Sequence, residues 1–250
     1  MNSQALNITG ERTIVFSSKH QAVMKDTITP DMARDDVFMD LFNHVKSYTM
    51  TSVEALYALY ASVNYILDRK IPGDFVECGV WRGGSSLLIA LILKQRNVCD
   101  RAVHLYDTFT GMPMPTHHDI DKYGRSGLEM MQQYSDEVGW CYAPLSEVKS
   151  VFEAESFQFP INFIEGDVMA TLPQQCPASV SLLRLDTDWY ESTALEYEIL
   201  YPVLAPGGVL IIDDYGVWAG SRKATDDFFQ SQPRPLIVRV DKEVRIAVKA

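Results

Sequence analysis

The sequence predicts an α/β fold in which a mainly parallel sheet is covered by helices on both faces. From about Asp74 onward, short apolar segments typical of strands alternate with longer amphipathic segments typical of helices. Hydrophobic residues make up 47% of the 250 residues, enough to bury a full core. Only residues 241–243 separate the last two apolar segments, too few for a crossover helix. These two segments are therefore expected to form an antiparallel hairpin at one edge of the sheet.

Seven segments are predicted to be strands. In chain order they are residues 75–80, 102–107, 161–165, 180–186, 208–213, 236–240 and 244–248. Helical periodicity between the first five strands is clearest over residues 85–96 and 192–203. The stretch 108–135 has no clear periodicity, and loops of that length are usually functional or disordered. It carries His117 and His118, which could line a site but are more readily explained as solvated loop residues.

The first 72 residues are predicted to form a helical appendage on a main domain of residues 73–250. Residues 29–31, Thr-Pro-Asp, resemble a helix start, and apolar positions recur at helical spacing as far as Val45. A second helix is expected from Thr51 to about Arg69. The appendage either only covers the sheet or also closes over a site as a lid.

Composition excludes several classes of protein. The chain has 22 Lys and Arg against 33 Asp and Glu, a formal net charge of −11, which disfavours binding to nucleic acid and to anionic lipid. Its longest apolar run, residues 87–93, is far shorter than a membrane span. No secretory signal is recognisable at the amino terminus, and the four cysteines have no metal-binding or redox spacing. We therefore expect a cytoplasmic protein with free thiols.

A glycine-rich turn, ECGVWRGGS at residues 77–85, follows the first predicted strand and opens a helix. Such a turn lets the backbone approach a ligand closely beside the helix amino terminus. The dinucleotide fingerprint is absent, because Trp81 stands where that motif needs its second glycine. Asp107 closes the next strand, where an acid can bind both hydroxyls of a ribose. The pattern favours a nucleoside-containing cofactor, although glycines can also serve tight helix–strand packing.

Four aspartates follow two other strands. Asp186 and Asp188 follow one, and Asp213 and Asp214 follow the other. Ligands of open α/β sheets bind beyond the carboxyl ends of the strands, so neighbouring strands would bring these acids together. Carboxylates so near to one another need a cation between them, or else their pKa values are raised. Oxygen ligands suit Mg²⁺, Ca²⁺ or Mn²⁺, with three carboxylates on the metal and the fourth free to act as a base. The plainer alternative is that they cap the following helices.

Taken together, the motifs resemble those of the macrocin O-methyltransferase (TylF-like) family. They are FVECGVWRGG at residues 75–84, YDTFTGMP at 106–113, RLDTDWYEST at 184–193, PGG at 206–208 and IDDY at 212–215. The resemblance covers roughly residues 48–229. It implies a class I methyltransferase (Rossmann-like) fold, a seven-stranded sheet with an antiparallel edge strand. It also implies S-adenosylmethionine and a divalent metal, usually Mg²⁺, as cofactors, and a homodimer.

The resemblance also implies roles for individual residues. The expected cofactor-binding residues are Thr49, Met50, Glu77, Gly79, Asp107 and Asp167, with Asp107 on the ribose and Asp167 near the adenine. The expected metal ligands are Asp186, Asp213 and Asp214, and Asp188 is the expected general base. Members of the family methylate sugar hydroxyls of antibiotics, so the expected partner is a small-molecule acceptor with such a hydroxyl. The stretch 108–135 and the appendage are expected to close over it.

The expected reaction follows from the chemistry of a hydroxyl group, a poor nucleophile at neutral pH. A divalent cation would lower the pKa of the hydroxyl, and Asp188 would take its proton during attack on the sulfonium methyl. The sequence leaves three alternatives: a catechol-type methyltransferase, a nicotinamide-dependent oxidoreductase, and a non-catalytic partner protein with the same fold. It does not identify the acceptor, the hydroxyl that is methylated, or the metal.

Overall fold

The strands form a seven-stranded sheet and a separate two-stranded hairpin. We describe a computed structural model over residues 9–17, 20–134 and 140–250. The strands of the large sheet are β3 (Asp74–Cys78), β4 (Val103–Asp107), β5 (Ile161–Glu165), β6 (Val180–Leu185), β7 (Leu204–Ile212), β8 (Val238–Arg239) and β9 (Arg245–Val248). Their order is β5-β4-β3-β6-β7-β9-β8, and β9 runs antiparallel to both of its neighbours. The predicted edge hairpin is confirmed, with β9 inserted between β7 and β8.

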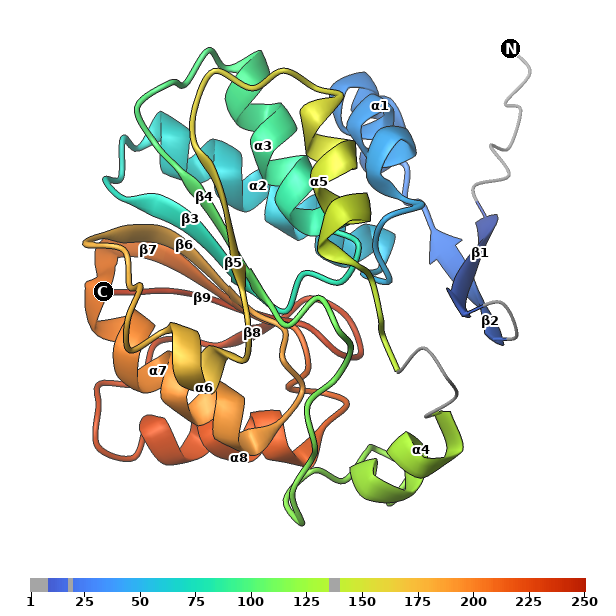
Figure 1. Cartoon of the computed structure of the whole chain (residues 1–250). Helices are drawn as coiled ribbons and strands as arrows, with labels where there is room; N and C mark the ends of the chain where they lie inside the picture. Colours follow the sequence, from blue (N-terminus) through green and yellow to red (C-terminus); the bar gives the residue numbers. More distant parts are fainter. Residues whose placement is uncertain (1–8, 18–19, 135–139) are drawn as a thin grey trace.

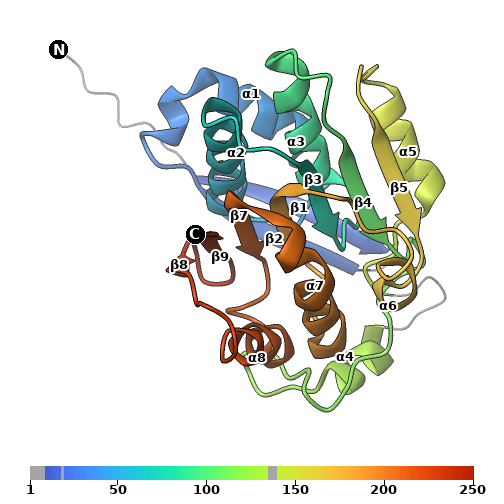
Figure 2. The ribbon, with the colours of Figure 1, turned by 90° about the vertical axis from the view of Figure 1, so that its left-hand side faces the viewer.

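Helices cover both faces of this sheet (Figures 1 and 2). On one face lie α1 (Asp36–Val45), α2 (Val53–Asp68), α3 (Gly84–Gln95) and α5 (Leu145–Glu153). On the other lie α6 (Val168–Thr171), α7 (Tyr190–Val203) and α8 (Ala219–Phe228). Each face has its own buried apolar cluster, so adjacent residues of one strand are both buried: Phe75 belongs to one cluster and Val76 to the other. Burial on both faces explains why the strands read as continuous apolar runs.

The amino-terminal region holds the two predicted helices and one element that was not predicted. A short 3₁₀ helix, η1 (Met32–Arg34), precedes α1, and Ser52 caps α2 by accepting from the backbone N–H of Ala55. The unpredicted element is an antiparallel hairpin of β1 (Thr9–Ser17) and β2 (His20–Thr27). It lies outside the large sheet, and β2 contacts α2 (Figure 1). Its apolar residues are few, so no strand stood out from the sequence.

The stretch 108–135 is tied to the main domain along its described part. It contains α4 (Gly127–Tyr134) and a bridge from Asp121 to Trp218. The buried carboxylate of Asp119 accepts from the backbone N–H of Thr116 (2.6 Å) and from that of Tyr190, the first residue of α7 (2.8 Å). Its expected role as a lid stays a prediction.

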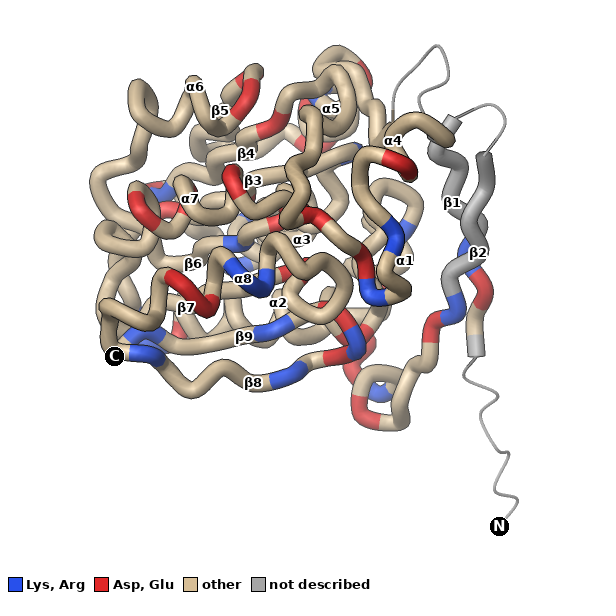
Figure 3. The backbone as a smooth tube through the Cα atoms, turned by 90° about the horizontal axis from the view of Figure 1, so that it is seen from below, with Lys and Arg blue, Asp and Glu red and all other residues tan. Residues whose placement is uncertain are grey.

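Charge is distributed unevenly over the molecule. Figure 3 shows basic positions along β8 and β9, which include Arg239 and Arg245. The acidic surplus is therefore not uniform, and a large part of it lies at the site described next. Within the described residues, no helix is both long and apolar enough to cross a membrane. All four cysteines are free thiols, as expected.

Candidate active site

A cavity of about 600 Å³ opens at the carboxyl ends of β3, β4, β6 and β7. Every site residue expected from the sequence lines it: Thr49, Met50, Glu77, Gly79, Asp107, Asp167, Asp186, Asp188, Asp213 and Asp214. Glu77 and Asp214, which are 137 positions apart in the chain (214 − 77), both line the cavity because the parallel strands all end at the same edge of the sheet. His117 and His118 are not among its described lining residues; their rings contact each other in a tilted arrangement, and the ring of His118 is likewise tilted against that of Tyr190.

Gly79 sits where two strand ends almost touch. Its φ is +82°, and a Cβ on this residue would lie 1.9 Å from the backbone oxygen of Asp186. The next residue back, Cys78, accepts a hydrogen bond from the backbone N–H of Asp186 (2.9 Å). Only glycine permits this approach, which brings the glycine turn and the aspartates of β6 to the same cavity.

Asp107 holds the glycine turn in place. One oxygen of its carboxylate accepts from the backbone N–H groups of Val80 (2.8 Å) and Trp81 (3.0 Å), and the other from Phe109 (2.7 Å). Burial raises the pKa of Asp107, while these backbone bonds act in the opposite direction. Each carboxylate oxygen can accept more than one bond, so the acid can also meet a ligand in the cavity. Asp167, which also lines the cavity, caps α6 by accepting from the backbone N–H of Met169.

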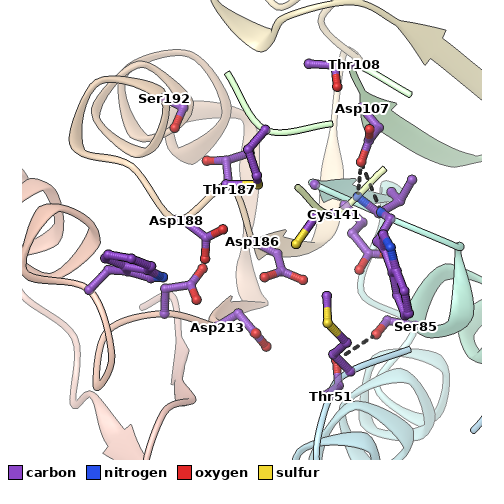
Figure 4. A pocket seen from close by; sticks show the side chains of 18 of the residues that line it. Thr51, Ser85, Asp107, Thr108, Cys141, Asp186, Thr187, Asp188, Ser192 and Asp213 are labelled. Atoms are coloured by element: carbon purple, nitrogen blue, oxygen red, sulfur yellow. Dashed lines mark hydrogen bonds between the residues drawn. The ribbon is translucent and has the colours of Figure 1, made fainter. Parts of the chain in front are cut away.

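The amino-terminal appendage supplies one wall of the cavity through residues 49–52. The backbone oxygen of Tyr48 accepts from the N–H of Gly84 at the start of α3 (2.9 Å). The hydroxyl of Thr49 donates to that of Thr51 (2.9 Å), and both lie near Ser85 (Figure 4). This segment thus packs directly against the glycine turn.

Arg184 is the main residue that sequence reasoning missed. Its side chain is 1% exposed and lies at the centre of four partners. It donates to Glu77 (2.6 Å), to the hydroxyl of Thr51 (2.9 Å), and to the carboxylates of Asp186 and Asp213. The signal available in the sequence was an arginine inside an otherwise apolar strand, LLRLD, because a charge buried there needs partners.

Three of the four aspartates converge on one point. Asp186, Asp188 and Asp214 each offer a carboxylate oxygen within 4.8 Å of the others. The backbone at Asp188 is left-handed (φ 65°), which Asp tolerates better than most residues. Figure 4 shows the side chains of Asp186, Asp188 and Asp213 directed into the same space, with Asp107 farther along the cavity. Asp213 lies on the Arg184 side of the group.

The electrostatics of these carboxylates reflect burial and crowding. Burial raises the pKa of Asp188 to about 7, a hydrogen bond with Asp214 acts against this, and the charges of Asp186 and Asp213 add to it. Burial and then the nearby Asp188 raise the pKa of Asp214 well above its usual range. For Asp186, burial raises the pKa and the charge of Arg184 opposes it. Carboxylates placed in this way are stable only with shared protons or a cation.

The residues present fit a hard divalent cation. Asp214, a member of the converging group, has one buried carboxylate oxygen with no hydrogen-bond partner among the described residues. Oxygen-only ligands are those preferred by Mg²⁺ and Mn²⁺. The capping alternative fails, because neither α7 nor α8 has a side-chain cap at its N-cap position.

An aromatic wall completes the cavity beyond the aspartates. Trp140 and Trp218 line it, with ring centroids 6.1 Å apart, and Trp189 packs against both at 5.8 and 4.8 Å. The indole N–H of Trp189 donates to the backbone oxygen of Pro113 (2.9 Å), which ties the wall to the stretch 108–135. No spacing in the sequence joins these tryptophans.

Comparison with known proteins identifies relatives over most of the chain. Residues 4–243 match the family described as Macrocin-O-methyltransferase (TylF). An 8-demethyl-8-(2,3-dimethoxy-alpha-L-rhamnosyl)-tetracenomycin-C 4'-O-methyltransferase of Streptomyces olivaceus is 35% identical over 185 residues, 73% of this chain and 67% of that protein. The demethyldecarbamoylnovobiocin O-methyltransferase of Streptomyces niveus is 30% identical over 182 residues, 73% of this chain and 68% of that protein.

Solved structures of O-methyltransferases have the same fold as this chain. The O-methyltransferase NovP superposes with a TM-score of 0.71 at 28% identity, over 84% of this chain and 88% of the other. A calicheamicin methyltransferase, CalS11, superposes with a TM-score of 0.61 at 18% identity, over 88% of this chain and 93% of the other, which is a likeness of fold alone.

Proposed function

Because the chain belongs to the macrocin-O-methyltransferase (TylF) family, we propose that it methylates a sugar hydroxyl of a natural product. It is an S-adenosylmethionine-dependent O-methyltransferase. The observation that carries the proposal is the convergence of Asp186, Asp188 and Asp214 at the cavity that the glycine turn also lines. The two relatives named above act, by their names, on a rhamnosyl tetracenomycin and on a novobiocin precursor.

The cofactor is proposed to lie along the glycine turn. Glu77 and Gly79 would border its methionine part together with Thr49 and Met50, and Asp107 would take the ribose hydroxyls. Asp167, at the far end of the cavity, would lie near the adenine. All six line one continuous cavity, and Glu77 is held rigidly there by Ser86 and Arg184. A rigid wall of this kind would help to orient the bound cofactor in the cavity.

The divalent metal is proposed to be held by Asp186 and Asp214. Asp213, whose carboxylate accepts from Arg184, would be the third metal ligand. When bound, the cation would lower the pKa of an acceptor hydroxyl and fix its direction. Asp186 also connects the aspartates to the glycine turn, because its backbone oxygen lies close to Gly79 at the end of β3.

Asp188 is proposed as the general base. It lines the cavity beside Asp186 (Figure 4), and the same cavity is lined by the glycine turn and by the aromatic wall, so an acceptor bound there would lie near it. Asp188 would take the hydroxyl proton while the acceptor oxygen forms a bond to the methyl carbon and the carbon–sulfur bond of S-adenosylmethionine breaks. The backbone of Asp188 is left-handed, and its carboxylate lies within 4.8 Å of an oxygen of Asp214.

The aromatic wall is proposed to bind the acceptor ring. Trp140 and Trp218 offer apolar surface beside Asp188 and Asp214, and sugar rings have one face rich in C–H groups that can lie on such a surface. A planar catechol would also fit there, so a catechol-type reaction is the second candidate. The nicotinamide-dependent and non-catalytic alternatives lose their support once the family is known.

A labelled-methyl assay separates the two candidates. The protein, Mg²⁺ and S-adenosylmethionine labelled in its methyl group are incubated with alkyl 6-deoxyhexosides, with glycosylated aromatic natural products and with 3,4-dihydroxybenzoate. We expect transfer to a glycoside, with the label on a sugar oxygen by mass spectrometry. Transfer to the catechol alone would contradict the sugar proposal while leaving the methyltransferase intact.

Two further expectations remain proposals. The chain is proposed to form a homodimer, which light scattering of the purified protein would test. The appendage and the stretch 108–135 are proposed to close over the acceptor, and slower amide exchange of these segments with acceptor bound would support this.

A further inference from the structure

The hairpin β1–β2 carries a buried ion pair that lies outside the cavity. Arg12 on β1 and Asp26 on β2 are diagonal neighbours across the two strands, since Arg12 is opposite Met24 and Asp26 is opposite Gly10, and their side chains are 7% and 3% exposed. The guanidinium meets both carboxylate oxygens, Nη2 at 3.0 Å and Nε at 2.7 Å. A buried charge pair of this kind is a weak source of stability, because desolvation offsets most of its attraction. The role of the ion pair must therefore depend on the other groups that the arginine contacts.

Arg12 binds the backbone of the segment that connects α1 to α2. Its Nη2 donates to the backbone oxygen of Thr51 (2.7 Å), and its Nη1 to those of Lys46 (3.1 Å) and Thr49 (3.5 Å). Lys46 is the carboxyl-terminal cap of α1, where the helix dipole favours a cation. One guanidinium thus binds three backbone oxygens of the loop between these two helices.

The same segment faces the cavity on its other side. Residues 49–52 line it, next to the glycine turn. The hydroxyl of Thr51 accepts from Arg184, whose other bonds hold Asp186 and Asp213. Thr51 is therefore held from outside through its backbone oxygen, and its side chain contacts Arg184, which in turn contacts Asp186 and Asp213. The pair on the hairpin and the acidic group are joined by this one residue.

We propose that Arg12 and Asp26 are positioning residues for cofactor binding, holding residues 46–51 in the conformation that lines the S-adenosylmethionine pocket. Asp26 neutralises the guanidinium and fixes its plane, and the guanidinium orders the segment before the cofactor arrives. Such pre-ordering removes an entropic cost from binding. It concerns the cofactor alone, so it stands or fails independently of which acceptor is methylated.

The test is binding of S-adenosylhomocysteine by calorimetry, without acceptor, to four proteins. They are the wild type, Arg12→Met, Arg12→Lys and, as a matched control, Lys25→Gln. Lys25 lies on the same hairpin, in an exposed pair with Glu11 at 3.8 Å, so the control removes a charge without touching the segment. Lysine keeps the charge beside Asp26 but cannot reach that carboxylate and the carbonyls together.

We expect Arg12→Met to weaken binding by about tenfold or more and Arg12→Lys by a smaller factor. Lys25→Gln should bind as the wild type does. With a methyl acceptor, the KM for S-adenosylmethionine should rise in the Arg12 variants while kcat at saturating cofactor stays nearly constant. Amide exchange over residues 46–52 should be faster in both Arg12 variants than in the control.

Wild-type affinity and wild-type exchange in folded Arg12→Met would overturn the proposal. If Arg12→Met does not fold, Arg12→Lys decides it by the same two measurements. A loss of kcat with unchanged affinity would also overturn it, because the pair would then act on the chemical step and not on cofactor binding.

Discussion

The buried guanidinium of Arg184 donates to the carboxylate of Asp213, which follows the neighbouring strand β7. The same side chain holds Asp186 and Glu77, so one positive charge is shared among three acids around the cavity. Arg184 therefore sets the spacing of two aspartates that the sequence assigns to a metal. This relationship leads to the first of five predictions.

Arg184→Met should destabilise the protein strongly. It leaves Glu77, Asp186 and Asp213 without a counter-charge in a buried place, so the free energy of unfolding should fall by about 3–5 kcal/mol. Chemical denaturation measures it. Arg96→Met is the control, because Arg96 forms an exposed pair with Asp68 and should cost about 1 kcal/mol or less. Equal losses in the two variants would contradict the prediction.

Asp188→Asn should lose turnover but keep the cofactor. Asparagine has the same shape and cannot accept the proton of a hydroxyl, so kcat should fall by a factor of about 10²–10⁴. Calorimetry with S-adenosylhomocysteine should give a nearly unchanged affinity. Near-normal turnover would remove Asp188 from the role of base.

Removal of divalent metal should abolish activity. Excess EDTA is expected to stop methyl transfer, and Mg²⁺ added in excess of the chelator should restore it, because the clustered carboxylates need a cation to bind the acceptor. Asp214→Asn should weaken Mn²⁺ binding measured by calorimetry, whereas Asp100→Asn at an exposed position should not. Full activity in EDTA would exclude the metal.

Gly79→Ala should be far more harmful than Gly124→Ala. Both glycines have φ near +80°, at +82° and +83°, so the backbone penalty is the same. The added Cβ would meet a backbone oxygen at 1.9 Å in the first and nothing within 4 Å in the second. We expect losses of more than about 3 kcal/mol and about 1–2 kcal/mol respectively, by denaturation. Similar losses would mean that the strand ends can separate easily.

Glu196→Gln should change how stability depends on pH. Glu196 is fully buried, accepts from Thr187 (2.9 Å), and burial raises its pKa well above the usual value. The folded state then holds a proton that the unfolded state loses above about pH 4.3, so Glu196 lowers stability as the pH rises. Glutamine never ionises, and its stability relative to the wild type should be greater at pH 8 than at pH 5. Thermal unfolding at both pH values measures it; an equal difference at the two would contradict it.

Much of the site was predictable because it depends on strand order alone. The sequence placed Asp107, Asp186 and Asp213 at the ends of apolar runs, and parallel strands end at one edge of a sheet. The hairpin β1–β2 was not predicted, since its few apolar residues give no strong pattern. The aromatic wall was not predicted either, because Trp140 and Trp218 come from different connections.

The sequence by itself determined the fold class, the glycine turn and the group of aspartates, because these follow from periodicity and from motifs within short segments. Only the tertiary structure decided how the charges are shared. Arg184 reaches Thr51 across 133 positions, and Arg12 reaches Thr51 across 39. Partners so far apart leave no local pattern. They are selected by burial, because a guanidinium removed from water must take whichever acceptors the fold brings within reach.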